Sequence, residues 1–138
     1  DMKIRVTCID DGSGRGAVIM AVIDGIGISS TDVRRIRAAV ADFAAENNIV
    51  SINVSVTHTH SGIDLQGVWD NTVGNVLNNI TLGALGLRDL QSGVDRKFLQ
   101  TIIDQTAKSI KDAYADMKTG ELTLAKMDIG DEYLRDRT

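Results

Sequence analysis

Two apolar strands separated by an amphipathic helix occupy residues 17–56, and this order of elements constrains the fold more than any other feature of the sequence. The first strand, AVIMAVID at residues 17–24, is apolar at odd and even positions alike, which is typical of a central strand. In the second, IVSINVSV at residues 49–56, the even-numbered residues from Val50 onward are apolar and the odd-numbered ones polar. This unit predicts two parallel strands joined by a right-handed crossover.

The helix between these strands is predicted over residues 28–48. Ser30 or Thr31 can cap its N-terminus, and Asp32 suits the positive end of the helix dipole. Apolar residues then recur at helical spacing and form one stripe. The stripe consists of Val33, Ile36, Val40, Phe43 and Ala44. A single apolar stripe predicts a helix that packs on the sheet.

Three further elements complete the predicted architecture. Residues 2–10 alternate with a period of two, and glycine-rich turn residues join them to 17–24, which predicts a hairpin. Residues 94–120 carry the strongest helical pattern of the chain, and residues 121–129 indicate a last strand. The sequence therefore predicts one α/β domain over residues 1–138, with helices packed on a mixed β-sheet around a strand–helix–strand core.

The segment at residues 61–93 contains six glycines and only short apolar patches. We interpret it as a long functional loop with one short helix near Val73–Ile80, because a loop of this length inside a compact domain is normally a lid, a binding loop or disordered. Trp69 lies in this loop. Its ring is expected either to line an apolar substrate channel or to pack inside the protein.

Charge and composition exclude several classes of function. The net charge is −4 and no basic patch stands out, so nucleic acid is not an expected partner. No apolar run approaches the roughly 18–20 residues that a transmembrane helix needs. Cys8 is the single cysteine, so the chain has no intramolecular disulfide, and we interpret its side chain as a small buried apolar group. The absence of proline suggests a piece of a longer chain.

The two histidines of the chain, His58 and His60, directly follow the strand at 49–56 and precede Ser61 and Gly62. If the strand continues, both rings leave it on its apolar side, at the carboxyl end where parallel sheets bind ligands. Histidine is the usual nitrogen ligand of zinc. The two rings are therefore expected to meet one metal, or to divide between metal and substrate. The alternative is a pair of loop histidines that hydrogen-bond neighbouring hydroxyl groups.

Asp24 ends the apolar strand at residues 17–24. It is expected either to be a structural carboxylate or to hydrogen-bond a histidine that binds the metal. A His-x-His motif alone does not identify a family, since several classes of metal-dependent hydrolase contain one. Metallo-β-lactamase-like hydrolases have an Asp two residues after the second histidine, where this chain has Gly62.

The string VTHTHSG at residues 56–62 resembles the Thr-His-Thr-His-Ser-Gly signature of the neutral/alkaline ceramidases, zinc amidases that cleave the N-acyl bond of ceramide. The similarity takes in GRGAVIMAVIDGIGIS at residues 14–29 and the strand before the histidines, and it covers roughly Met2–Gly67. The family follows its signature with Pro-Gly-Gly, where this chain has Ile-Asp-Leu.

The resemblance implies a role for each matched residue. His58 corresponds to the first zinc ligand, and His60 to the histidine that contacts the scissile group or the metal-bound water. Asp24, Ser61 and Gly62 would shape and support the site. The family completes its zinc site with a His, a Glu and a Tyr farther along the chain, and this sequence has no third histidine. The resemblance thus implies the N-terminal portion of a larger zinc amidase catalytic domain.

The function expected from this resemblance is zinc-dependent hydrolysis of the N-acyl bond of a ceramide-like lipid. The expected cofactor is Zn²⁺, and the expected partner is a lipid-like small molecule. Family resemblance alone suggests a secreted or cell-surface protein. A non-catalytic domain of the same fold and a different metal-dependent hydrolase are the alternatives.

Overall fold

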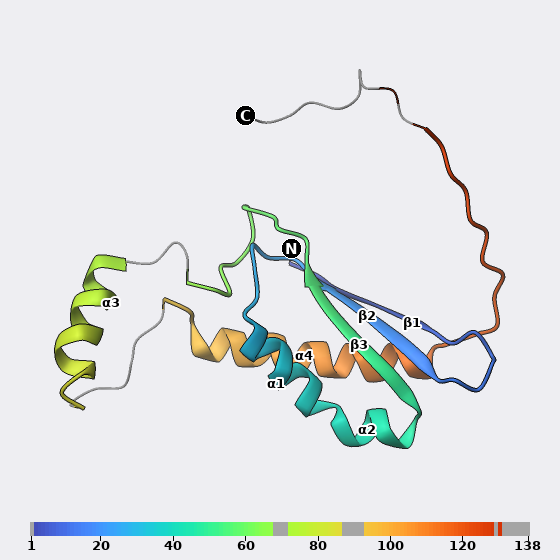
Figure 1. The fold of residues 1–138 in the computed structure, drawn as a ribbon, viewed down its shortest axis with the longest axis horizontal. Helices are drawn as coiled ribbons and strands as arrows, with labels where there is room; N and C mark the ends of the chain where they lie inside the picture. Colours follow the sequence, from blue (N-terminus) through green and yellow to red (C-terminus); the bar gives the residue numbers. More distant parts are fainter. Residues whose placement is uncertain (1, 68–71, 87–92, 129, 131–138) are drawn as a thin grey trace.

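A three-stranded mixed sheet forms the centre of the protein in a computed structural model that describes residues 2–67, 72–86, 93–128 and 130 (Figure 1). The strands are β1 (Ile4–Ile9), β2 (Ala17–Ile23) and β3 (Ile49–Val56), in the spatial order β1-β2-β3. β1 pairs with β2 in an antiparallel hairpin, and β2 pairs with β3 in parallel. The predicted α/β fold class, with its strand–helix–strand core, is confirmed.

Helices α1 (Ser30–Ala39), α2 (Ala41–Glu46) and α4 (Arg96–Ala115) belong to the body of the protein, whereas α3 (Thr72–Asn78) continues into a π-helical turn, η1 (Asn79–Gly83). The single helix predicted between the parallel strands is therefore two helices that meet at Val40. The short helix predicted near Val73–Ile80 is confirmed as α3. Within the part of the chain that the structure describes, no helix has both the length and the apolar character to cross a membrane.

The core lies between one face of the sheet and the helices α1 and α4. In β2 the odd-numbered residues are buried and the even-numbered ones are more exposed. Ile19 and Ile23 of β2, Ile36 of α1 and Ile110 of α4 are members of one buried cluster. β2 is the central strand of the sheet, as predicted, although Met20 on the face opposite the helices is half-exposed.

The register of β3 differs from the predicted alternation at its first residues. Ala17 pairs with Ile49 but Val18 pairs with Ser51, so the ladder contains an irregularity at Val50. Ile49 is buried and Val50 is exposed, the reverse of the prediction. The extra residue turns the side chain of Val50 away from the core, and the predicted alternation resumes at Ile52.

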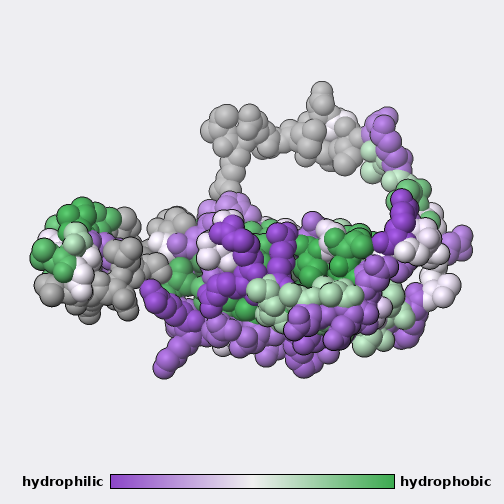
Figure 2. Space-filling model, turned by 60° about the horizontal axis from the view of Figure 1, so that its bottom comes forward, coloured by the Kyte–Doolittle hydropathy of each residue, from purple (hydrophilic) through white to green (hydrophobic). Residues whose placement is uncertain are grey.

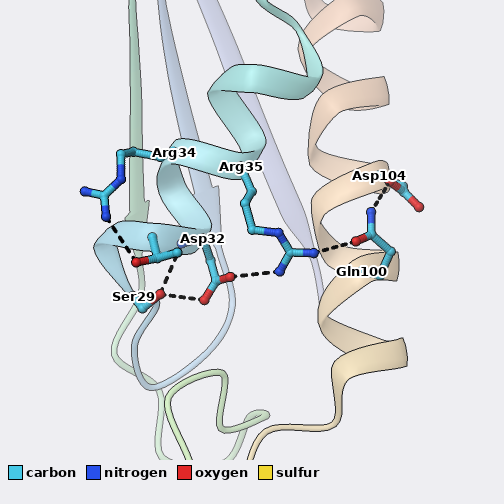
Figure 3. A network of polar contacts seen from close by, with 7 residues as sticks. Ser29, Asp32, Arg34, Arg35, Gln100 and Asp104 are labelled. Carbon is cyan, nitrogen blue, oxygen red and sulfur yellow. Dashed lines mark hydrogen bonds and ion pairs between the residues drawn. The ribbon is translucent and has the colours of Figure 1, made fainter. Parts of the chain in front are cut away.

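A polar network joins the beginning of α1 to α4 (Figure 3). Ser29, one residue before the predicted caps, is the N-cap of α1, and its hydroxyl oxygen accepts a hydrogen bond from the Asp32 backbone N–H at 3.1 Å. Arg35 donates to the Asp32 carboxylate at 3.0 Å and to the Gln100 side-chain oxygen at 2.6 Å. Gln100 in turn donates to Asp104 at 2.8 Å. The network fixes the start of α1, which follows the loop after β2.

The strand predicted over residues 121–129 is not formed at 121–128, the portion that the structure describes. Leu122 and Leu124 are 79% and 85% exposed. The chain leaves α4 and runs away from the sheet (Figure 1). Alternating sequence alone does not produce a strand, because its backbone N–H and C=O groups need a neighbouring strand as hydrogen-bond partner.

Truncation of Ile36 tests the packing of α1 on the sheet. Its side chain is completely buried in the core cluster, so Ile36→Ala should lower the free energy of unfolding by about 2–5 kcal/mol. Leu122→Ala, at an exposed position, is the control and should change it by less than about 0.5 kcal/mol. Urea denaturation measures both values. Equal losses in the two variants would contradict this description of the core.

Candidate functional site

The candidate site is built from the loops that follow β2 and β3. Because these strands are parallel, both loops leave the same edge of the sheet. The Thr57 backbone N–H donates to the Ile23 carbonyl oxygen at 3.1 Å, and the two loops also form an isolated β-bridge between Ile28 and Leu65. Leu65 is buried in the core. The loops are therefore held against each other and anchored to the hydrophobic core.

Two glycines allow the loops to come this close. A Cβ atom on Gly62 would lie 2.9 Å from the Thr59 methyl carbon and 3.4 Å from the Gly25 Cα. A Cβ atom on Gly25 would lie 3.3 Å from the Ile63 carbonyl oxygen. Both positions leave too little room for a side chain without displacing a neighbour. Gly62, which the family resemblance places in the site, thus contributes close backbone packing.

His58 lies just beyond the end of β3 in a left-handed backbone conformation, with φ of 57°. This conformation is uncommon for a residue with a side chain, and it ends the strand alternation. The prediction that both histidines continue the apolar side of the strand is therefore wrong. The turn brings the His58 ring to the loop after β2, where Nδ1 lies 2.6 Å from the Ile26 carbonyl oxygen.

The contact with Ile26 determines which ring nitrogen of His58 carries the proton. A carbonyl oxygen can only accept, so Nδ1 must be the donor. In the neutral imidazole, Nε2 then has a free lone pair. Histidines that bind metals in proteins commonly donate their second ring N–H to a backbone carbonyl or a carboxylate in this way.

His60 lies next to His58 at the exposed surface of the loop. The Nε2 atoms of the two rings are 3.4 Å apart, the ring centroids are 4.9 Å apart, and the planes are almost perpendicular at 88°. A tetrahedral zinc ion with Zn–N bonds of about 2.0–2.1 Å separates two ligand nitrogens by roughly 3.3–3.4 Å. The spacing of the two Nε2 atoms therefore fits a pair of ligands to one zinc ion.

The two imidazoles do not belong to a larger set of ligands within the described residues. Among these residues, no group of three or more His, Cys, Asp or Glu side chains is arranged to hold a metal ion. A catalytic zinc generally has three protein ligands and an open position. Within the described residues, the pair of histidines therefore offers two of the three protein ligands that a catalytic zinc generally takes.

The carboxylate of Asp24 hydrogen-bonds residues at β1 and not the ring of a histidine. Its carboxylate accepts hydrogen bonds from Arg5 at 2.9 Å and from the Lys3 backbone N–H at 3.0 Å. The hydrogen bond from Arg5 is the largest cause of a lowered Asp24 pKa, and Thr57 also contributes. Asp24 therefore fastens β1 to the end of β2, which is the structural role of the two that the sequence left open.

Among the cavities that the described residues line at these loops, two adjoin each other. One, of about 580 Å³, lies against the loop that carries the histidines. The other, of about 620 Å³, lies on the face of the sheet opposite the helices, and Asp24 and Thr57 line both cavities. The first is lined by Met2, Asp24, Thr57, Thr59, Ser61, Gly62 and Ile63. Ser61 thus lines this cavity, whereas His58 and His60 do not, and Trp69 lies outside the described residues.

Sequence reasoning identified both histidines but missed the group that orients His58. The Ile26 carbonyl oxygen is a backbone atom, and no side-chain pattern reports where it points. The indirect signal was the sequence Asp-Gly-Ile-Gly at residues 24–27, in which glycine on both sides of Ile26 allows close approach of the neighbouring loop.

Substitution of Asp24 tests its structural role through the pH dependence of stability. Because the folded-state pKa of Asp24 lies below its ordinary value of 3.8, the ionised carboxylate stabilises the fold above that pH, and the contribution is lost as the pH falls through the folded-state pKa. Asp24→Asn should therefore lower the urea midpoint more at about pH 7 than at about pH 2.5. An equal decrease at both pH values would contradict this role.

Comparisons with protein-family models, curated proteins and solved structures find no match to this chain. The resemblance to ceramidases therefore rests on the sequence pattern of residues 2–67 alone. Its functional consequences are developed below as a proposal.

Proposed function

We propose that this chain carries the zinc-binding histidines of an amide hydrolase that acts on a lipid-like substrate, as the resemblance to neutral ceramidases implies. One observation supports the proposal above all others. The His58 Nδ1 atom donates to the Ile26 carbonyl oxygen, while the Nε2 atoms of His58 and His60 lie 3.4 Å apart. A fixed tautomer and a ligand-like spacing are both properties of metal-binding histidine pairs.

In this proposal His58 holds the zinc ion through Nε2, and Ile26 keeps the ring in the required tautomer and orientation. His60 either shares the metal or faces the scissile amide, where it stabilises charge that develops on the carbonyl oxygen. Zinc, when bound, lowers the pKa of a coordinated water to about 7 and polarises the substrate carbonyl. Gly25 and Gly62 keep the two loops close enough for the hydrogen bond from His58 to Ile26.

The cavities give the proposal a place for an amphipathic substrate. The cavity at the loop after β3, which neither histidine lines, has polar groups at Asp24 and Ser61, and apolar side chains at Met2 and Ile63. The adjoining cavity on the open face of the sheet includes Met20 and Val22. Both volumes fall within the range of small-molecule sites, roughly 300–1,000 Å³. A polar head at the loop after β3 and an apolar chain along the sheet would suit these surroundings.

The second candidate is a non-catalytic domain that has the fold and the histidine pair but does not use zinc. The observation that favours it is the pair itself, since the described residues offer two imidazoles and no third ligand grouped with them. Two neutral imidazoles at this spacing can also form a hydrogen bond from one Nε2–H to the other Nε2. Zinc affinity and its dependence on His58 distinguish these two candidates.

Substitution of His58 is the direct test. With two imidazole ligands, the 138-residue chain should bind zinc weakly in calorimetric titration, leave N-acyl sphingosine uncleaved, and lose zinc binding in His58→Ala. In the longest natural polypeptide that contains this sequence, His58→Ala should abolish both bound zinc and hydrolysis of a fluorogenic ceramide analogue.

The thiol of Cys8 provides the matched control, because it is the one other strong zinc ligand type in the chain. Burial is the main cause of its raised pKa, so the thiol is protonated at neutral pH, and Cys8→Ser should leave zinc binding unchanged. Stoichiometric zinc in the His58→Ala variant would refute the assignment. Absence of zinc binding in the unaltered chain and in Cys8→Ser alike, with no hydrolysis of any N-acyl amide, would favour the non-catalytic alternative.

A further inference from the structure

An apolar stripe on α3 and η1 faces solvent. Val73, Val76, Leu77 and Ile80 recur at the spacing of one helical face, and they are 78%, 48%, 65% and 65% exposed. The corresponding stripes of α1 and α4 include buried residues such as Ile36 and Ile110. α3 is thus amphipathic in the same sense as the other helices, but its apolar side has no partner within the described residues.

This segment also differs from the rest of the chain in charge. Residues 72–86 contain no Asp, Glu, Lys, Arg or His, although a quarter of the whole sequence is charged. Figure 1 shows α3 standing beyond the end of the sheet, apart from α1 and α4, and Figure 2 shows that its surface is largely hydrophobic. An uncharged apolar surface on a projecting element is well placed for contact with another phase or molecule.

We propose that α3 and η1 dock on the surface of a bilayer of zwitterionic lipids, an inference that rests on the proposed action on a lipid-like amide. A short amphipathic helix can lie in the interface with its apolar face in the acyl boundary. Most such helices add Lys or Arg to attract anionic lipids. This segment has neither, and the whole chain has a net charge of −4, so an anionic surface would repel the protein.

The composition of the stripe favours lipid over a protein partner. Protein interfaces depend on anchors such as Trp, Tyr and Arg, and residues 72–86 contain none of these. The exposed side chains are aliphatic, and their contacts with hydrocarbon need no directional partner. In the sequence, α3 follows shortly after the loop that carries His58 and His60, so docking here would bring the histidines to the membrane in which such a substrate resides.

Vesicle flotation tests the proposal on the 138-residue chain. The protein should float with phosphatidylcholine vesicles, should bind phosphatidylserine vesicles no more strongly, and should bind phosphatidylcholine equally at low and high salt. The double variant Leu77→Gln with Ile80→Gln should bind phosphatidylcholine at least about tenfold more weakly. The matched control is Leu122→Gln with Leu124→Gln, which changes two leucines elsewhere in the chain that are more exposed and should leave binding unchanged.

Three results would overturn the docking proposal. The first is no flotation with phosphatidylcholine vesicles. The second is an equal loss of flotation in both double variants. The third is a dimer in analytical ultracentrifugation that only the double variant Leu77→Gln with Ile80→Gln dissociates. Circular dichroism should show that both variants are folded. Zinc titration of the same variants separates the two proposals, since it should be unaffected by changes in α3. Normal zinc binding without flotation would refute the docking proposal and leave the proposed function standing.

Discussion

Parallel pairing of β2 with β3 is the constraint on which the candidate site depends. It requires a crossover, which α1 and α2 supply, and it sends the loops after both strands to the same edge of the sheet. Had the two strands been antiparallel, the Ile26 carbonyl and the histidines would lie at opposite edges. The buried cluster that contains Ile19, Ile23 and Ile36 stabilises this pairing. The packing of the hydrophobic core therefore also determines where the loops of the site lie.

The sequence predicted those parts of the fold that arise from periodicity. Residue spacing predicted the helix within residues 94–120, the hairpin of β1 with β2 and the crossover from β2 to β3, and each was confirmed. Where the prediction failed, the deciding interaction was not local. Residues 121–128 alternate like a strand but have no strand to pair with, and Val50 is displaced by an irregularity in its pairing with β2.

The same distinction applies to the candidate site. The sequence identified His58 and His60 by residue type and position, but strand alternation gave the wrong reason for their proximity. The rings meet because His58 adopts a positive φ and because Ile26 offers a carbonyl oxygen across two loops that glycine allows to touch. Asp24 was identified from its place at the end of β2, yet its partners Arg5 and Lys3 come from β1 and the residue before it, which no pattern around Asp24 indicates.

The central claim is that Ile26 fixes His58 in one tautomer and leaves its Nε2 lone pair facing His60. Long-range ¹H–¹⁵N correlation spectroscopy of the imidazole groups measures this property directly, without metal or substrate. The account predicts that neutral His58 is protonated at Nδ1, and that the ¹⁵N resonance of its Nε2 atom moves when zinc is added. A neutral His58 that is protonated at Nε2 would contradict the account, because the nitrogen assigned to the metal would then have no lone pair to donate.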